Sequence, residues 1–219
     1  MSVSSEWQYV ISSLPILVQG AYVTLYLSLG SMVGALVLGL LVALMRISKF
    51  RLIKGVARFY VSFFRGTPLL VQLLLFYYGL TSYNIVLDPL PAAYLGLILH
   101  FGAYISETFR ATILSIKKGQ WEAAFSLGMN YLHTFWHVIL PQAVRISIPP
   151  LWNSFIDILK SSSLASVVMV GEITRIVTEQ SAAKFIFMPY FMALALFYWI
   201  VVIAMGRVQE WLEQRLSIP

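Results

Sequence analysis

Two pairs of opposite charges lie inside otherwise apolar segments, where ionisable groups are costly unless they are paired or wetted. Glu107 precedes Arg110 by three residues, and Asp157 precedes Lys160 by the same spacing. On a helix this spacing places both charges on one turn, so each pair could simply satisfy itself. Glu107 is also a candidate to bind the ammonium group of a solute. Intramembrane polar residues of this kind predict a path for a polar solute.

The segment Arg65-Gly66-Thr67-Pro68 is a third candidate, because it opens a long charge-free run. Thr67 followed by Pro68 is typical of a helix N-cap and a first helical position. A half-helix that starts there would present its N–H groups to the path, and helix starts bind anions. Gly66 and Thr67, with Arg65, are therefore predicted to hold a carboxylate. The alternative is a plain helix start at the membrane surface, with Arg65 reaching the headgroups.

Catalytic chemistry has little support. The chain has no cysteine, which excludes disulfides, iron–sulfur clusters and thiol catalysis. His133 and His137 are four residues apart, as metal ligands on a helix can be, but no third ligand accompanies them and we interpret them as packing or capping residues. His100 is interpreted as a paired interior residue. No Gly-x4-Gly-Lys-Ser/Thr phosphate loop is present, so we expect a chain that is no enzyme and binds no cofactor itself.

The elements that must position these residues are membrane-spanning helices. Of 219 residues, 59% are hydrophobic and 11% are charged, and the mean hydropathy is +0.81. A soluble domain carries about a quarter charged residues, and a helix of roughly 20 residues crosses a bilayer. Five apolar runs suit such helices: 7–45, 66–87, 89–106, 146–171 and 185–206. Residues 1–219 are predicted to form one all-α integral membrane domain of about five transmembrane helices, without a cleavable signal peptide.

The basic residues are distributed to one side of these spans. With the N-terminus outside, eleven would face the cytoplasm: Arg46, Lys49, Arg51, Lys54, Arg58, Arg110, Lys117, Lys118, Arg145, Arg207 and Arg215. Arg175 and Lys184 are left clearly outside. The positive-inside rule explains this asymmetry. The net charge of +6 therefore predicts membrane lipid as a partner, an N-terminus outside, a cytoplasmic C-terminus and no nucleic-acid partner.

The cytoplasmic segment 119–141 carries large apolar residues at nearly helical spacing from Trp121 to Ile139. Gly128 and Asn130 are of helix-ending and helix-capping types, which predicts two short helices that meet at an elbow. Pro141 is expected to end the second helix. Apolar helices outside the bilayer need something to pack on. A docking protein and the lipid surface are the two alternatives.

The sequence of this elbow resembles a known loop. Gly119, then Glu122-Ala123-Ala124, Gly128 and Leu140-Pro141 resemble the EAA loop of ABC importer permeases. Phe64-Arg65-Gly66-Thr67-Pro68-Leu69, Ala103-Tyr104 with Glu107 and Arg110, and Lys160 with Ser163-Leu164 are similar to signatures of the polar amino-acid (histidine/glutamine-type) permeases. Leu87-Asp88-Pro89, Gly119-Gln120-Trp121-Glu122 and Ile148-Pro149-Pro150-Leu151 look most like cystine permeases.

The resemblance implies a type I ABC importer permease in a bacterial inner membrane. Its partners would be two ATPase subunits that bind ATP and Mg, a second permease chain (a copy of this one or a homologue) and an extracytoplasmic solute-binding protein. Gly119, Glu122, Ala123, Ala124 and Gly128 would form the coupling helix and its turn against the ATPase. Without those partners, the rival interpretation is a secondary transporter that works alone.

The resemblance also implies an amino-acid substrate, with L-cystine as the best guess and glutamine, glutamate, histidine or arginine as alternatives. The candidate substrate-binding residues are Arg65, Gly66, Thr67, Glu107, Asn153, Lys160, Ser161 and Ser162. Many relatives carry Asp-Thr where this chain has Ser161-Ser162. If that carboxylate reads an amino group, its absence speaks against basic substrates. The serines could instead bind a neutral polar substrate, or bond back to their own helix.

Overall fold

The computed structural model describes residues 3–216, and within that range it contains helices and turns without a strand. The all-α prediction is confirmed. The elements follow in the order α1 (Val3–Ser12), α2 (Leu14–Ile47), α3 (Arg51–Gly66), α4 (Leu69–Leu74), the π-helical turn η1 (Leu75–Gly79), the 3₁₀ turn η2 (Leu80–Tyr83), α5 (Pro89–Ser115), α6 (Lys118–Ser126), α7 (Tyr131–Thr134), the π-helical turn η3 (Phe135–Ile139), α8 (Leu140–Ser161), the 3₁₀ helix η4 (Ser162–Val168), α9 (Ile173–Lys184) and α10 (Met188–Leu216).

Three described helices are long and apolar enough to cross a membrane by themselves: 14–47, 89–115 and 188–215. Two further spans exist if each of two bent pairs counts as one. Residues 51–66 and 69–83 meet at 105°, and residues 131–168 and 173–184 meet at 50°. The expected number of about five therefore agrees with the structure when the bent pairs are included.

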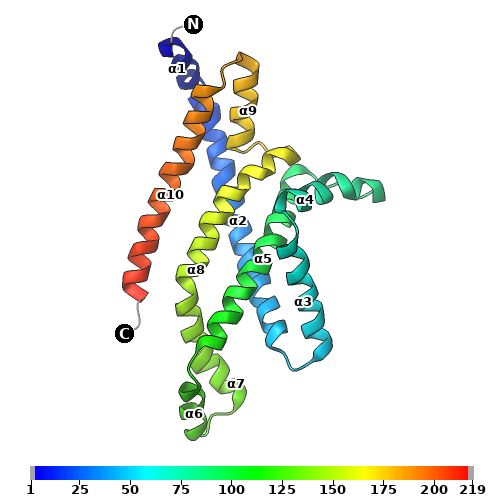
Figure 1. Cartoon of the computed structure of the whole chain (residues 1–219), viewed down its shortest axis with the longest axis vertical. Helices are drawn as coiled ribbons and strands as arrows, with labels where there is room; N and C mark the ends of the chain where they lie inside the picture. Colours follow the sequence, from blue (N-terminus) through cyan, green and yellow to red (C-terminus); the bar gives the residue numbers. More distant parts are fainter. Residues whose placement is uncertain (1–2, 217–219) are drawn as a thin grey trace.

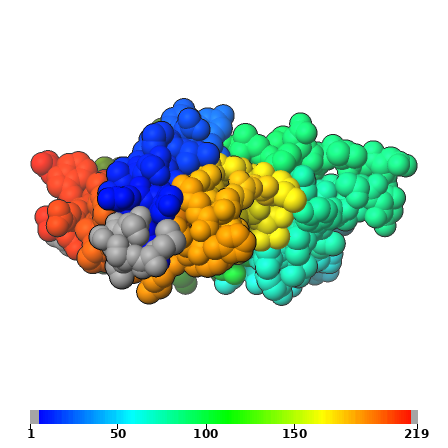
Figure 2. All heavy atoms as spheres, turned by 90° about the horizontal axis from the view of Figure 1, so that it is seen from above, coloured from blue at the N-terminus to red at the C-terminus, as the bar shows by residue number. Residues whose placement is uncertain are grey.

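The second predicted span is wrong in its position. Residues 66–87 do not form one straight helix, because the chain turns sharply at Pro68. Pro68 restricts the preceding residue to extended backbone, and Thr67 accordingly has φ −116° and ψ 144°. Thr67 ends α3 and does not cap α4 with its side chain, contrary to the N-cap prediction. Beyond this turn α4, η1 and η2 form an arm that extends away from the other helices (Figures 1 and 2).

Helix α3 occupies the basic stretch between the first two predicted spans, 7–45 and 66–87. Its four basic residues, Arg51, Lys54, Arg58 and Arg65, hid an amphipathic helix from a search for charge-free runs. Ala57 and Val61 are buried against Val42 of α2 and Ala103 of α5. The Tyr60 hydroxyl donates a hydrogen bond to the Leu99 carbonyl oxygen at 2.6 Å. The apolar face of α3 therefore packs on the bundle, while Arg51, Arg58 and Arg65 are exposed.

Helices α2 and α5 form the centre of the bundle (Figure 1). Leu27, Ala35 and Ala43 of α2 are buried together with Leu97 and Ile105 of α5. Gly39 permits the close approach, since a Cβ atom there would lie 2.6 Å from Ile105 Cγ2 and 3.1 Å from the Ser106 backbone nitrogen. Small residues at such contacts are typical of membrane helix pairs. This contact brings the C-terminal end of α2 next to the second half of α5.

The elbow between α6 and α7 is confirmed. Gly128 has φ +80°, a left-handed conformation that glycine adopts at little cost. The Asn130 side chain caps α7 by accepting a hydrogen bond from the His133 backbone N–H at 2.8 Å. The prediction that Pro141 ends the second helix is wrong, because the helical run continues from Tyr131 through η3 into α8. Proline lacks a backbone N–H and its ring crowds the preceding helical turn. The wider π-helical turn η3, directly before α8, accommodates the ring and the missing hydrogen bond.

Candidate functional site

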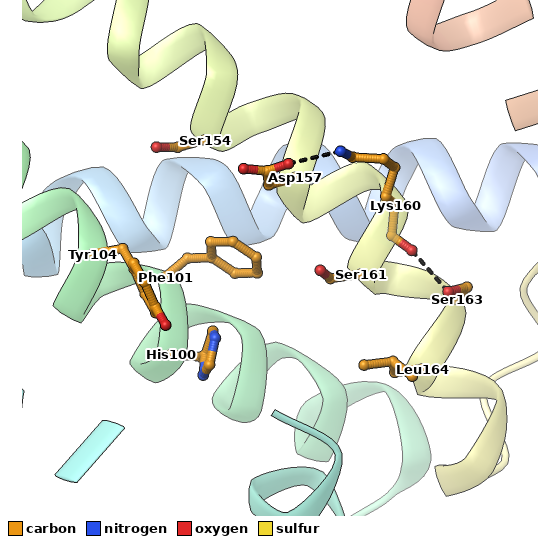
Figure 3. A pocket seen from close by; sticks show the side chains of 9 residues that line it. All are labelled: His100, Phe101, Tyr104, Ser154, Asp157, Lys160, Ser161, Ser163 and Leu164. Atoms are coloured by element: carbon orange, nitrogen blue, oxygen red, sulfur yellow. Dashed lines mark hydrogen bonds and ion pairs between the residues drawn. The ribbon is translucent and has the colours of Figure 1, made fainter. Parts of the chain in front are cut away.

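A hollow of about 540 Å³ lies between α5 and the C-terminal half of α8, and we call it the central hollow. Figure 3 shows side chains of both helices converging on it. Its lining residues are His100, Phe101 and Tyr104 of α5 with Ser154, Asp157, Lys160, Ser161, Ser163 and Leu164 of α8 and η4. Ligand pockets typically measure about 300–1,000 Å³, so the hollow is large enough for a small solute.

Opposite charges lie together on one wall of the central hollow. Lys160 Nζ is 2.8 Å from Asp157 Oδ1, and the two side chains are 53% and 58% exposed. This confirms that the i, i+3 spacing produces an ion pair. Because the pair is wetted and exposed, exchange of either partner for a solute charge costs little, as is usual for exposed ion pairs.

The α5 wall of the hollow is aromatic and polar. The His100 ring lies 5.1 Å from the Tyr104 ring and 5.2 Å from the Phe101 ring, measured between centroids. His100 Nδ1 lies 3.2 Å from Gln72 Oε1 of α4, so His100 is paired as expected. The α5 wall can thus offer a flat surface and a ring nitrogen to a solute.

Gln72 joins this wall to the predicted carboxylate-binding segment. Its Nε2 donates to the Thr67 hydroxyl at 2.8 Å and to the Thr67 and Phe64 carbonyl oxygens at 3.1 and 3.0 Å. The Gln72 side chain is buried, with 1% of the residue exposed. Gln72 therefore fixes the turn at Pro68 and ties it to His100.

Arg65 approaches the hollow from α3 through an aromatic contact. Its guanidinium carbon lies 5.1 Å from the centroid of the Tyr104 ring, which is a cation–π distance. Gly66 is exposed, and no heavy atom would lie within 4 Å of a Cβ atom placed on it. The segment 65–67 thus borders the α5 wall without lining the central hollow.

The three serines after Lys160 have different environments. Ser161 lines the central hollow. Ser162 is fully buried and its hydroxyl donates to the Leu159 carbonyl oxygen at 2.7 Å. Ser163 donates to the Lys160 carbonyl oxygen at 2.7 Å (Figure 3). The sequence left two alternatives for Ser161 and Ser162: binding a solute or bonding back to their own helix. Ser162 bonds back to the helix. Ser161 lines the hollow, where a solute could reach it.

Two other candidate substrate residues lie apart from this hollow. The Glu107 carboxylate forms an ion pair with Arg46 of α2 and accepts from Arg110 Nη2 at 2.6 Å through its other oxygen. Asn153 is exposed on α8 and is not among the lining residues. The structure therefore brings Lys160 and Ser161 to the hollow, places Arg65, Gly66 and Thr67 beside it, and keeps Glu107, Asn153 and Ser162 out of it.

The predicted substrate residues did not include the lining residues Ser154, Phe101 and Tyr104, nor Gln72 next to them, and helical spacing could have indicated Ser154 and Tyr104. Ser154, Asp157 and Ser161 recur at intervals of three and four, which places them on one face of α8. His100 and Tyr104 show the same interval on α5. Gln72 carried no such signal, because its contacts depend on the turn at Pro68 that only the fold reveals.

The elbow presents apolar side chains to its surroundings at the end of the molecule farthest from the N-terminus (Figure 1). Phe125, Leu127, Tyr131, Leu132 and Trp136 are 45–83% exposed, and we call them the elbow patch. Glu122 and Ala123 are exposed on α6, whereas Ala124 is buried. On the inner side, Phe135 and Ile139 pack with Ile113 of α5. The elbow is therefore anchored on the bundle and still exposes a large apolar surface.

His133 and His137 pack against each other on the helical run that follows Asn130. Their rings are stacked with centroids 4.0 Å apart, and His137 Nδ1 lies 3.0 Å from the His133 carbonyl oxygen. Residues 3–216 contain no group of three or more His, Cys, Asp or Glu side chains that could hold a metal ion. These contacts agree with the packing interpretation.

The chain belongs to the family described as binding-protein-dependent transport system inner membrane component, whose model matches residues 35–218. The exposed elbow and the helical arrangement agree with this membership. The chain is therefore a multi-pass permease subunit of an ABC importer, and its role is transport rather than catalysis.

The chain is similar over most of its length to individual permeases named for amino-acid transport. The chain is 45% identical to the L-cystine transport system permease protein TcyB of Bacillus subtilis (strain 168), over 96% of this chain and 91% of that protein. It is 36% identical to the glutamine transport system permease protein GlnP of Escherichia coli (strain K12), over 97% and 98%. A crystal structure of an amino acid ABC transporter with histidines matches with a TM-score of 0.90 and 33% identity, over 94% of this chain and 96% of that one.

A structure of the MetNI methionine ABC transporter in an inward-facing conformation shares the fold, with a TM-score of 0.73 at 19% identity. It covers 92% of this chain and 98% of its own. The type I importer fold predicted from the elbow sequence is thereby confirmed.

Proposed function

We propose that this chain takes up a polar amino acid in an ATP-driven importer, with L-cystine as the first candidate substrate. The observation that carries the proposal is the central hollow, where a half-exposed carboxylate and ammonium lie 2.8 Å apart. An amino acid carries an ammonium and a carboxylate group on one carbon. Asp157 would bind its ammonium group and Lys160 its carboxylate, each through a charge-assisted hydrogen bond.

The identity of the substrate rests on the relatives and on the neutral polar lining. The 45% identity to an L-cystine permease supports cystine. Ser154 and Ser161 suit a polar side chain without net charge, and the α5 rings offer a surface to the sulfur atoms of cystine. Glutamine is the second candidate, because permeases named for glutamine match at 36% identity over nearly the whole chain.

The remaining candidate residues receive separate roles in this proposal. Arg65 and Thr67 support the α5 wall through Tyr104 and Gln72, and Gly66 joins them at the end of α3. Glu107 holds helices together through its two arginine partners, and Ser162 caps the end of α8. Asn153, exposed on α8, is a proposed contact of the substrate on its way to or from the hollow.

The proposed assembly has two permease chains, two ATPase subunits that bind ATP and Mg, and an extracytoplasmic solute-binding protein. Each permease chain forms one domain, 1–219, with the coupling loop at 119–141. The N-terminus is proposed to lie outside and the C-terminus in the cytoplasm. The ends of α2 and α5 with their basic residues lie toward the same end of the molecule as α6, which supports this orientation through the positive-inside rule (Figure 1).

Reconstitution tests the proposed function. The chain is placed in proteoliposomes with its ATPase subunits and binding protein, and labelled L-cystine is followed in the presence and absence of ATP. We expect accumulation that requires ATP and all partners and that excess unlabelled cystine abolishes. Accumulation by the chain alone, without ATPase or nucleotide, would contradict the importer proposal, and competition by glutamine alone would move the assignment to glutamine.

The coupling role of Gly119, Glu122, Ala123, Ala124 and Gly128 has its own test. Glu122→Lys reverses an exposed charge on α6 that is proposed to pair with a basic residue of the ATPase, so uptake should be lost while the chain still inserts and folds. Glu210→Lys, an exposed charge reversal on α10, is the matched control and should transport normally. Normal uptake by Glu122→Lys would remove the docking role from this residue.

A further inference from the structure

A second hollow lies near the C-terminal ends of α2 and α5 and beside the first turns of α3. It measures about 260 Å³ and is lined by Arg46, Ile47, Lys54, Arg58, Arg110 and Leu114, and we call it the basic hollow. Three separate helices contribute its cationic side chains. It shares no lining residue with the central hollow, so the substrate role proposed above does not account for it.

The charges of the basic hollow do not balance within the described residues. Glu107 accepts from both Arg46 and Arg110 and uses one oxygen for each. Among residues 6–215, no carboxylate lies within ion-pair distance of Lys54 or Arg58. Four positive side chains thus meet one negative charge, which leaves an excess of three. Like charges that converge at a membrane protein repel one another unless water or an anion compensates them.

One donor in this hollow is also left without an acceptor. The Nε atom of Arg110 is shielded from solvent and has no hydrogen-bond partner. Buried polar atoms are nearly always paired, so an orphan of this kind calls for an acceptor. Guanidinium groups present donors in a fixed fork that matches the oxygens of a phosphate group.

We propose that the basic hollow is a binding site for a phosphate-bearing anion, supplied either by the headgroup of an anionic phospholipid or by free phosphate. Lys54 and Arg58, one helical turn apart on α3, bind the phosphate oxygens from one side, and Arg110 binds them from α5. Basic pockets between transmembrane helices bind anionic headgroups in this way. Ile47 and Leu114 complete the lining with apolar surface that an acyl chain could contact.

Such an anion would clamp three helices at the end of the molecule that carries the elbow. Arg46 belongs to α2, Lys54 and Arg58 to α3, and Arg110 to α5. Neutralising their repulsion stabilises the contact between these helices. Bound anion should therefore raise the thermal stability of the folded chain, since a ligand of the native state shifts unfolding by mass action.

The test measures the thermal unfolding midpoint of the full-length chain with its ATPase partners in an uncharged detergent. Short-chain phosphatidylglycerol, short-chain phosphatidylcholine and inorganic phosphate are titrated at constant ionic strength. The site variant is Lys54→Gln/Arg58→Gln, whose side chains have no ion pair to lose. The control is Arg51→Gln/Arg145→Gln, which removes the same charge from exposed positions outside the hollow.

We expect phosphatidylglycerol to raise the midpoint of the wild type and of the control at similar concentrations. The site variant should need about a hundredfold more, because two charged contacts are gone and each contributes about tenfold. Weaker stabilisation by phosphatidylcholine with none by inorganic phosphate assigns the lipid source, whereas stabilisation by inorganic phosphate that the site variant loses assigns the free anion. An equal response of the site variant and the control, or no response of the wild type to either anion, overturns the proposal.

Discussion

Glu107 lies between Arg46 and Arg110 where α2 meets α5, whereas Asp157 pairs with Lys160 at the edge of the central hollow. The first carboxylate is 29% exposed and links two helices, and the second is 58% exposed and its partner lies one turn away on its own helix. The same i, i+3 spacing therefore occurs in two different kinds of ion pair: one that includes a partner from another helix, and one that stays within a single helix. We expect the charge that links helices to act in stability, and we propose that the charge that faces the hollow binds a solute.

Removal of the linking charge should give the largest effect on stability. Glu107→Gln leaves two arginines of different helices without their carboxylate. We expect a loss of about 2 kcal/mol, less than the 3–5 kcal/mol of a fully buried pair because the site is partly wetted. Thermal or denaturant unfolding of the purified chain measures it.

The matched control for Glu107→Gln is Glu179→Gln, which breaks the exposed Arg175–Glu179 pair on α9. It should change stability by less than about 0.5 kcal/mol. Equal losses from the two variants would remove the distinction between the linking charge and an ordinary surface pair.

Removal of the Asp157 charge in the central hollow should affect transport more than stability. Asp157→Asn keeps the shape of the side chain and takes away the charge proposed to bind the substrate ammonium. Uptake at low substrate concentration should fall about tenfold or more, which corresponds to the loss of one charged hydrogen bond. The unfolding midpoint should stay close to that of the wild type, and a variant that is unstable and transports normally would invert the comparison.

The smallest effect is expected one turn farther along α8. Ser161→Asp adds a carboxylate to the lining of the central hollow and should shift the substrate preference severalfold towards amino acids with a net positive charge, such as arginine. Competition between labelled cystine and unlabelled arginine measures this shift. Thr178→Asp, which adds the same charge at an exposed position of α9 outside the hollow, is the matched control and should leave the competition profile unchanged. An unchanged competition profile in Ser161→Asp would take Ser161 out of the site.

Contacts between residues a few positions apart could be predicted from the sequence, whereas contacts between distant helices could not. The Asp157–Lys160 pair, the Gly128 turn and the Asn130 cap follow from spacing and residue type within a few positions. Arg46 and Glu107 are 61 residues apart, and their contact depends on how α2 packs on α5. The sequence near Arg46 or near Glu107 contains no pattern that predicts their contact.

The predicted helix boundaries were wrong near prolines and in the stretch rich in basic residues. The turn at Pro68 divided an apolar run that looked continuous, and Gln72 gained its contacts to Thr67 and His100 from that turn. Pro141 was expected to end a helix, and a π-helical turn carried the helix past it. Helix α3 was missed because its apolar face is interleaved with basic residues, although a periodicity search would have detected it.

A reversed ion pair tests most directly whether Asp157 and Lys160 read the substrate. The double variant Asp157→Lys/Lys160→Asp keeps both charges and their spacing but exchanges their positions. Uptake of labelled L-cystine is measured in proteoliposomes with the complete set of partners, beside the unfolding midpoint of the same preparation. The account predicts a midpoint near that of the wild type and uptake reduced at least tenfold, whereas wild-type uptake by the reversed pair would contradict it.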